Sequence, residues 1–588
     1  MCSPNIFSRS RRKSPNPCVT SRCGPSRRIF LGLAAALATV LCGWAPALAQ
    51  VERRELPVLQ GKPAPPQDSG GPGAGSPPGI ENWRPPPSEP PSSVSQRSGS
   101  VLPLDVWRGL DAAAMDRLLA QSPLPPQSPA LAKLIGRVLA SGAPGDGRET
   151  AVKIAGLKRA GRVDELVELL GGLAQGGEPG AAAGYALALF AADRQEEGCA
   201  VELGTVPTAA STYSDARRAA FLIPAYCAAA KGDRQGASLV LTLARDSGVD
   251  AGIAAAVVDR PAKPSSRGAN LPRNVDVLDY LFLKLGQSGG SADIAAKATP
   301  ELLFLLARDK DAPAELRLAA AERAAALNII DGEVLAGAYR ETAPKLGKSA
   351  QSPAALRARL FATLEGQTSD KTRAESIDAL LASGKDARIE IPIAEALAQA
   401  GEGLAQAPQA ASFAETAVRV AALAGEDDAA WEWTGAGGEP VRSWQLLLGA
   451  TDPFGERARS ALDAGVEIAR KAQLPGALLQ RLVTVLDALG EDVPIPLWGL
   501  AGETPQPKDG YLPATGVLTA LKEAADAGEV GRTVLLVAST LGPSGPQGAH
   551  LIALGDGLRA LKRVGLDAEA RRLALEALYP HWPSRGKV

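Results

Sequence analysis

Few residues in this 588-residue chain have both the type and the spacing that catalysis or metal binding needs. The two histidines, His550 and His581, lie near the C-terminus. Neither has a cysteine pair beside it or belongs to an HExxH sequence, the patterns that commonly hold zinc. The chain also lacks GxSxG, the motif of a common serine nucleophile. We therefore predict no catalytic residue and no metal site.

One short stretch resembles part of a nucleotide-binding motif. Gly347-Lys348-Ser349 matches the end of the phosphate-binding loop GxxxxGK[ST]. In that loop the first glycine allows the backbone to wrap around a phosphate, and Thr342 occupies its position here. The sequence therefore predicts no nucleotide and no other cofactor.

Three tryptophans form the one local concentration of aromatic residues: Trp431, Trp433 and Trp444. Aromatic side chains in a cleft bind sugars or peptide side chains. In a chain with 4% aromatic residues, large rings also fill gaps where helices meet irregularly. Packing is the favoured interpretation, and a ligand site is the alternative.

The first 49 residues have the composition of an export signal. They contain seven basic and no acidic residues, an apolar run from Ile29 to Leu41, and small residues before a cleavage site expected after Ala49. The Arg27-Arg28 pair also resembles a twin-arginine signal, with an ordinary secretory leader as the alternative. Both routes predict a periplasmic protein without a stable membrane span after cleavage.

Residues 50–103 form a second compositional segment. Between residues 61 and 100, 26 of the 40 residues are Pro, Gly or Ser. Such a segment buries too little apolar surface to offset the entropy of ordering. We predict a disordered linker, which serves as a spacer or, alternatively, as a proline-rich ligand.

Cleavage after Ala49 leaves two of the six cysteines, Cys199 and Cys227. In an oxidising compartment an isolated pair usually forms a bridge. The two are separated by 28 residues in a region where successive helices are expected to pack together. The sequence predicts a disulfide between them, and two buried free thiols are the alternative.

The charge balance excludes one class of partner. Seven of the 63 basic residues lie in the export signal, which leaves 56 against 64 acidic residues and a formal net charge of −8. This balance argues against nucleic-acid binding.

Apolar residues follow helical spacing from residue 104 onwards, and turn glycines interrupt them at intervals. The stretch Tyr226–Gly248 illustrates the unit: a small apolar run, a break at Gly232, then an amphipathic segment. Similar breaks follow Gly161, Gly425, Gly490, Gly528 and Gly565, and the last three glycines are spaced by 38 and 37 residues. A period in the thirties is typical of stacked helical hairpins.

This pattern resembles a degenerate tetratricopeptide-type repeat over about half of the chain. That family places small residues five and twelve positions after the turn glycine, so that two helices can approach closely. Ala237 and Ala244 match after Gly232, and Ala570 and Ala577 match after Gly565. The positions after Gly161 and Gly528 hold Leu166 and Thr533, and the family's regular aromatic and proline are missing. The resemblance therefore implies an architecture and no site residues.

The predicted fold is all-α: stacked helical hairpins that form an extended or curved solenoid. We expect one set of repeats at 104–260 and a second at 273–588, separated by the proline-rich stretch Pro261–Pro272. Ala314–Leu327 is the strongest single helix prediction, and Val534–Val537 is the one run that suggests a strand. Pro494–Pro513 is expected to be irregular.

Two functional classes remain open. The favoured one is an exported non-catalytic scaffold that binds another cell-envelope protein, because a solenoid presents a long surface without dedicated chemistry. The alternative is a helical envelope enzyme, a lyase or hydrolase acting on polysaccharide or peptidoglycan. Oligomeric state and the identity of the partner are left open by the sequence.

Overall fold

The structure of the chain is a computed structural model. It describes residues 100–142, 147–178, 180–204, 215–259, 271–290, 293–366, 369–398, 410–451 and 456–583. The predicted export signal and nearly all of the predicted linker lie outside these ranges. None of the described helices combines the length and the apolar character that crossing a bilayer requires.

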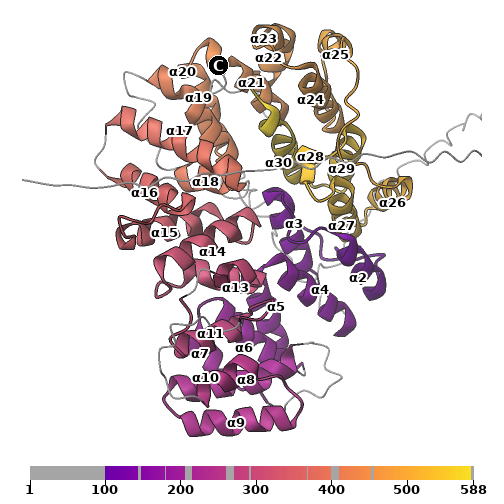
Figure 1. The fold of residues 1–588 in the computed structure, drawn as a ribbon. Coiled ribbons are helices and arrows are strands. Elements are labelled where there is room, and N and C mark those ends of the chain that lie inside the picture. Colours follow the sequence, from indigo (N-terminus) through magenta and orange to yellow (C-terminus); the bar gives the residue numbers. More distant parts are fainter. Residues whose placement is uncertain are drawn as a thin grey trace, which may run out of the picture. The chain divides into compact units, whose positions relative to one another are not determined.

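The described residues are helical almost throughout, as the sequence predicts, and contain only two isolated β-bridges (Figure 1). The helices of the first half are α2 (Ala112–Gln121), α3 (Pro129–Ala140), α4 (Gly147–Ala160), α5 (Val163–Gln175), α6 (Ala181–Ala191), α7 (Gln195–Ala200), α8 (Ala216–Ala230), α9 (Arg234–Asp246), α10 (Gly252–Val258), α11 (Val277–Leu285), α12 (Asp293–Lys297), α13 (Pro300–Arg308), α14 (Ala314–Ala326), α15 (Gly332–Thr342) and the 3₁₀ turn η1 (Ala343–Lys345).

The helices of the second half are α16 (Pro353–Glu365), α17 (Asp370–Ala387), α18 (Glu390–Leu397), α19 (Ala410–Ala424), α20 (Asp427–Ala436), α21 (Glu439–Thr451), α22 (Glu456–Asp463), α23 (Gly465–Lys471), α24 (Gly476–Ala488), α25 (Ile495–Gly502), α26 (Thr515–Asp526), α27 (Val530–Leu541), α28 (Gly545–Gly548), α29 (Leu551–Arg563), α30 (Asp567–Leu578) and the 3₁₀ turn η4 (Tyr579–His581).

Most helices pack on the next one along the chain, which is the arrangement expected of stacked hairpins. One apolar core runs through the described residues from Val106 to Trp582. Most of the predicted boundary between two sets of repeats, residues 261–270, falls outside the described ranges. On either side of it, α10 and α11 pack against each other.

The turn at Gly232 shows why the chain folds into hairpins. Gly232 has φ +87°, a left-handed conformation that residues with a Cβ rarely adopt. It places the Asp233 N–H 2.9 Å from the Ala228 carbonyl oxygen, a bond that closes the end of α8. The Asp233 carboxylate then accepts from the Gly236 N–H at 2.8 Å and caps the start of α9. Two residues thus end one helix and begin the next.

All the glycines predicted at such turns have a positive φ and lie between two helices. Their φ angles range from +68° to +87° at Gly161, Gly232, Gly425, Gly490, Gly528 and Gly565. The same conformation occurs at five residues that are not glycine: Asp193, Gln287, Asn328, Arg388 and Gln473. The hairpin turn therefore recurs more often than glycine alone indicates.

The small residues noted after two of the turns lie inside the packed helices. Ala237 and Ala244 in α9, and Ala570 and Ala577 in α30, are completely buried. One secondary-structure prediction is wrong, and a second holds only for the residues that follow α25. Val534–Val537 belongs to α27, where burial in the core overrides β-propensity. The stretch Pro494–Pro513 contains α25, because prolines are tolerated in the first turn of a helix.

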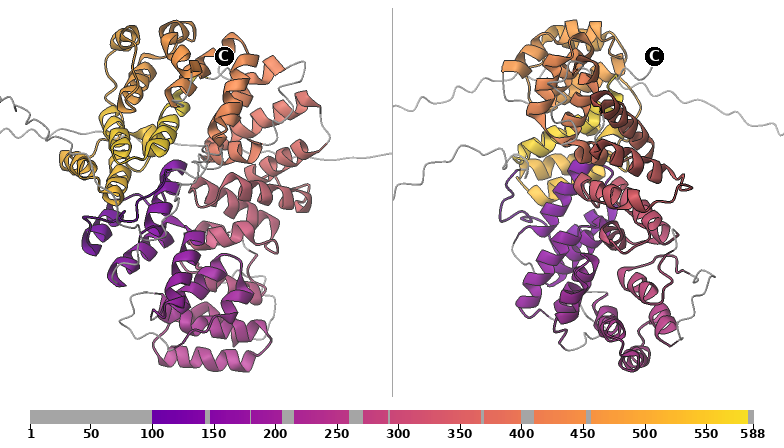
Figure 2. Two further views of the ribbon diagram at one scale, coloured as in Figure 1. Left: turned by 180° about the vertical axis from the view of Figure 1, so that it is seen from behind. Right: turned by 90° about the vertical axis from the view of Figure 1, so that its left-hand side faces the viewer.

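The two ends of the helical unit contact each other, which sequence periodicity does not indicate. In Figures 1 and 2 the indigo helices α2 and α3 lie beside the yellow helices α27 and α30. The Gly531 N–H donates to the Val106 carbonyl oxygen at 2.8 Å. At the start of α3, the Ser128 hydroxyl and the Ala130 N–H both donate to the buried carboxylate of Glu576.

The Gly161 turn is expected to tolerate no side chain. Its φ is +68°, and a Cβ there would lie 2.8 Å from Cγ1 of Ile329 and 3.1 Å from Cβ of Pro300. We expect Gly161→Ala to lower the free energy of unfolding by about 3 kcal/mol, because left-handed strain and overpacking add. The measurement is urea denaturation followed by far-UV circular dichroism.

Gly232→Ala is the matched control. Its φ is also positive, but nothing lies within 4 Å of the Cβ position, so only the strain of about 1 to 2 kcal/mol should appear. If the two variants lose the same free energy of unfolding, the close packing around the Gly161 turn contributes nothing to the effect.

Candidate functional site: a charged cavity beside the contact between the ends of the helical unit

A cavity of about 850 Å³ lies among helices that are far apart in the sequence. Its wall comes from α3, the start of α5, α13, the α14–α15 turn, α18, the α19–α20 turn and α30. The lining includes both Gly161 and Gly425, so the predicted turns help to form it. A volume of this size is typical of sites that hold a small molecule or a short peptide segment.

Four helices, α5, α15, α20 and α30, present their N-terminal turns to the cavity, and each turn carries acidic side chains. The acidic residues of these turns that line the cavity are Asp164, Glu165, Asp331, Glu333, Glu426, Asp427 and Glu569. Carboxylates at these positions stabilise the helices, because the N-terminal end of a helix dipole is positive. The acidic lining therefore has a structural reason.

Ion pairs across the cavity engage many of these carboxylates. Glu569 accepts from Arg137 Nη1 at 2.6 Å and from the Ser100 N–H at 2.9 Å. Burial raises the pKa of Glu569, but the hydrogen bonds from Ser100 and Arg137 outweigh it and hold that pKa below its ordinary value. Lys133 Nζ lies 3.0 Å from Glu395, which also accepts from the Gly332 N–H. These bonds join α3 to α30 and α18.

Arg308 is the cavity cation with the weakest compensation. Its guanidinium stacks on the Phe304 ring at 3.5 Å, and its nearest carboxylate, Asp164, is 3.9 Å away. Nη1 is buried and has no hydrogen-bond partner among the described residues. Burial lowers the pKa of Arg308, and burial also raises the pKa of Asp164 despite the nearby guanidinium. Burial therefore disfavours the charged forms of both Arg308 and Asp164, and their ion pair compensates for this only in part.

Two arginines of α30 complete the basic part of the lining. Arg571 Nη2 lies 2.8 Å from Glu491. Arg572 donates to the carbonyl oxygens of Ala422 and Leu423 at the end of α19. A cation at the C-terminal end of a helix satisfies carbonyl groups that have no partner within the helix. Most charged groups of the cavity thus serve to hold helices together, an arrangement that suits recognition by shape and charge.

The three predicted tryptophans do not line the cavity. Trp431 and Trp433 in α20, and Trp444 in α21, are at most 8% exposed. The Trp444 ring lies 6.1 Å from the ring of Tyr579. Their burial favours the packing interpretation over a ligand site.

The histidines and the partial phosphate-loop sequence have structural surroundings. His550 Nδ1 accepts from the Ile552 N–H at 3.2 Å and caps α29. His581 Nε2 lies 3.3 Å from the Gln547 carbonyl oxygen. Thr342 is buried at the end of α15, five residues before Gly347. Within the described ranges, no group of three or more potential ligands of the His, Cys, Asp and Glu types could hold a metal ion.

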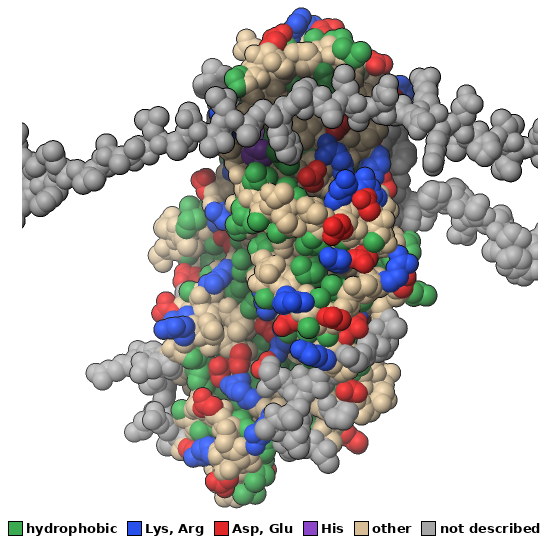
Figure 3. Space-filling model, turned by 90° about the vertical axis from the view of Figure 1, so that its right-hand side faces the viewer, with side chains coloured by type: hydrophobic (Ala, Val, Ile, Leu, Met, Phe, Trp, Pro, Cys, Tyr) green, Lys and Arg blue, Asp and Glu red, His purple; other side chains and the backbone are tan. Residues whose placement is uncertain are grey.

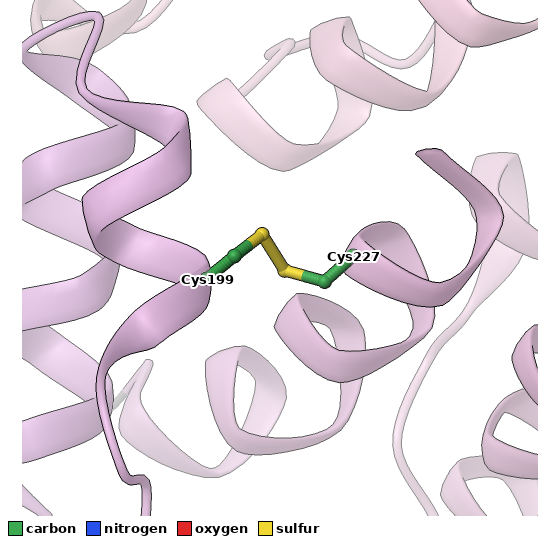
Figure 4. The surroundings of a disulfide bond; sticks show 2 residues. All are labelled: Cys199 and Cys227. Carbon is green, nitrogen blue, oxygen red and sulfur yellow. A yellow bond between two sulfur atoms is a disulfide. The ribbon is translucent and has the colours of Figure 1, made fainter. Parts of the chain in front are cut away.

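A disulfide joins Cys199, at the end of α7, to Cys227 in α8, as the sequence leads us to expect (Figure 4). The two Cα atoms are 5.9 Å apart, within the usual range for a bridge. The bridge ties a six-residue helix to a helix of 15 residues.

The sequence contained few signals for the cavity. Phe304 and Arg308 are spaced for contact on one helix face, but so are many pairs in the chain. Comparison of the chain with family models, with curated proteins and with solved structures gives no match. The site is therefore defined by its geometry and its charges.

Proposed function

We propose that this chain is an exported, non-catalytic scaffold of tetratricopeptide-like repeats that binds another protein of the cell envelope. The observation that carries the proposal is the cavity: hairpin turns from distant repeats form its wall, and ion pairs and helix caps engage most of its charged groups. Such a wall can recognise a partner by shape and charge, whereas proton transfer needs a carboxylate or base that is free to change its charge.

Export is part of the proposal. The composition of residues 1–49 supports it, and a disulfide between Cys199 and Cys227 is in keeping with an oxidising compartment. The tetratricopeptide-like assignment is supported by the recurring left-handed turns and by the buried alanines that follow two of them.

The test is affinity purification of the protein from an envelope extract. We expect one or more envelope proteins to co-purify, and Arg308→Gln to reduce their affinity by about tenfold, because it removes the least compensated charge of the cavity. Arg563→Gln is the matched control: it breaks an exposed ion pair with Asp526 and should leave binding unchanged.

Three outcomes would contradict the proposal. One is hydrolysis or lytic cleavage of peptidoglycan or polysaccharide by the purified protein. Another is recovery of the protein from the cytoplasmic fraction with its leader intact. The third is recovery of a stoichiometric cofactor in place of a protein partner.

A further inference from the structure

Glu576 is a buried carboxylate at the contact between α3 and α30, and it has no counter-ion. Its residue is 5% exposed. The carboxylate accepts from two neutral donors, the Ser128 hydroxyl and the Ala130 N–H, the latter at 2.9 Å. No described residue forms an ion pair with it. The red carboxylates visible in Figure 3, by contrast, lie at the surface among blue Lys and Arg side chains. A buried carboxyl with only neutral partners favours its uncharged form.

The two cations whose charges act on Glu576 are bound elsewhere. Arg572 donates to two carbonyl oxygens at the end of α19. Lys133 is mostly exposed, and its Nζ lies 3.0 Å from Glu395. Burial raises the pKa of Glu576 above its ordinary value, although the bonds from Ser128 and Ala130 and the charges of Arg572 and Lys133 act in the other direction.

The remaining charges around α30 do not compensate Glu576 either. Helices α3, α21, α24, α28, α29 and the turn η4 pack against α30, and α28 contains no charged residue. The other described charged side chains of these elements form bonds elsewhere: Arg137 with Glu569, Arg442 with Glu467, Arg481 with the Pro546 and Ala549 carbonyl oxygens, Asp487 and Asp556 with Arg559, Lys562 with the Leu489 carbonyl oxygen, Arg563 with Asp526, and His581 with the Gln547 carbonyl oxygen.

A protonated carboxyl fits the same geometry. One oxygen still accepts from the Ala130 N–H, and the other donates its proton to the Ser128 hydroxyl oxygen, so neither hydrogen bond is lost. Ionisation instead leaves an unpaired charge in a site that is nearly closed to solvent. The contact is also separable from the rest of the core, because α3 packs on α4 and α5, and α30 packs on α24 and α29, without it.

We propose that Glu576 makes the α3–α30 contact a proton-dependent latch on the cavity. The contact is firmest while the carboxyl is protonated, and it loosens when the proton is released to solvent. Both helices contribute to the cavity wall, α3 through Lys133 and Arg137 and α30 through Glu569 and Arg572, so loosening widens the cavity. The latch concerns access to the cavity and does not require that a protein binds there.

The direction of the pH effect follows from linkage between folding and protonation. A carboxyl whose pKa is raised by folding contributes its full stability below its ordinary pKa, and this contribution is lost as the pH rises through the raised value. The contact should therefore weaken from about pH 5 upwards. Glu569 does not mask this change. Burial acts on it too, but the bonds from Ser100 and Arg137 hold its pKa below the ordinary value, so its contribution is complete at about pH 5.

The test is amide hydrogen exchange of the purified full-length chain between about pH 5 and pH 8, read by mass spectrometry, with each rate divided by the intrinsic rate at that pH. The Ala130 N–H bonds directly to Glu576, so the first turn of α3 reports the contact. Its protection should fall by up to about tenfold per pH unit, the limit for release of one proton. Peptides from α8 and α9, which pack on other helices, should keep their protection.

Glu576→Gln is the decisive variant. Its side-chain oxygen can accept from the Ala130 N–H and its amide can donate to the Ser128 hydroxyl oxygen, so it imitates the protonated carboxyl at every pH. Protection of α3 should then stay high up to about pH 8. The matched control is Glu569→Gln on the same helix. It breaks the ion pair with Arg137, so it should lower the protection of α3 throughout and keep the pH dependence.

His581 also titrates near this range, but its effect has the opposite sign. Burial lowers the pKa of His581, so its contribution to stability is lost as the pH falls. The wild type and Glu576→Gln both contain it, and the difference between them isolates Glu576. The same pH dependence in these two chains would overturn the latch. Protection of α3 that stays constant in the wild type would overturn it as well, and this series decides alone if Glu576→Gln does not fold.

Discussion

Replacement of Arg357 by Met should lower the free energy of unfolding by about 3 to 5 kcal/mol, the usual effect of removing one partner of a buried ion pair. Arg357 Nε and Nη2 donate to the two carboxylate oxygens of Glu322 at 2.7 and 2.5 Å. The side chains of Arg357 and Glu322 are only 7% and 12% exposed. Without the guanidinium, a nearly buried carboxylate would lose its counter-ion.

The loss should be large because this network joins four consecutive helices. Glu322 lies in α14 and also accepts from the Tyr339 hydroxyl of α15 at 2.8 Å. Arg357 belongs to α16, and its Nη1 donates to the Ser383 carbonyl oxygen of α17 at 3.2 Å. Burial raises the pKa of Tyr339, so its phenol remains a donor to Glu322 at neutral pH. The network therefore fixes the packing of the α14–α15 hairpin against the α16–α17 hairpin.

Urea denaturation of three variants tests this account. Arg340→Met is the matched control, because Arg340 pairs with Glu365 at the surface, where an ion pair contributes about 0 to 1 kcal/mol. Combining Arg357→Met with Glu322→Gln should recover part of the loss, since the neutral amide leaves no unpaired buried charge and its oxygen can still accept from the Tyr339 hydroxyl. If Arg357→Met and Arg340→Met lower the free energy of unfolding by the same amount, the buried network does not hold the hairpins together.

The sequence predicted six hairpin turns, each with a glycine at the left-handed position. The turn between α14 and α15 escaped prediction because Asn328 occupies that position with φ +56°. Asn adopts this conformation more readily than most residues, and its side-chain amide also donates to the Pro126 carbonyl oxygen at 2.9 Å. A contact with a residue 202 positions away cannot be read from local spacing.

The contact between the two ends of the helical unit could not be predicted from the sequence, for a related reason. Helical periodicity shows which face of α3 and α30 is apolar, but not which distant helix covers it. Ser128 and Glu576 form part of this contact across 448 residues of sequence. Arg308 was missed because the features that single it out, the stack on Phe304 and the long distance to Asp164, exist only in the folded chain.

The disulfide could be predicted because only two of the six cysteines lie outside the predicted export signal. Its loss should have the second large effect. Opening a loop of 28 residues should lower the free energy of unfolding by about 3.5 kcal/mol in the chain-entropy model. We expect this loss in the double variant Cys199→Ala with Cys227→Ala. Amide hydrogen exchange should become faster in α7 and α8, because these are the two helices that the bridge joins.

Reduction of the wild-type protein separates the bridge from the packing of the cysteines. Both side chains pack against the core, so the alanine variants also lose apolar contacts. Dithiothreitol opens the bridge and leaves the sulfur atoms in place. Stability that is equal with and without reductant, or two free thiols titrated in denaturant from protein extracted without reductant, would contradict the bridge. A large effect of reduction would mean that α7 depends on the bond, because six residues bury too little apolar surface to hold a helix in place.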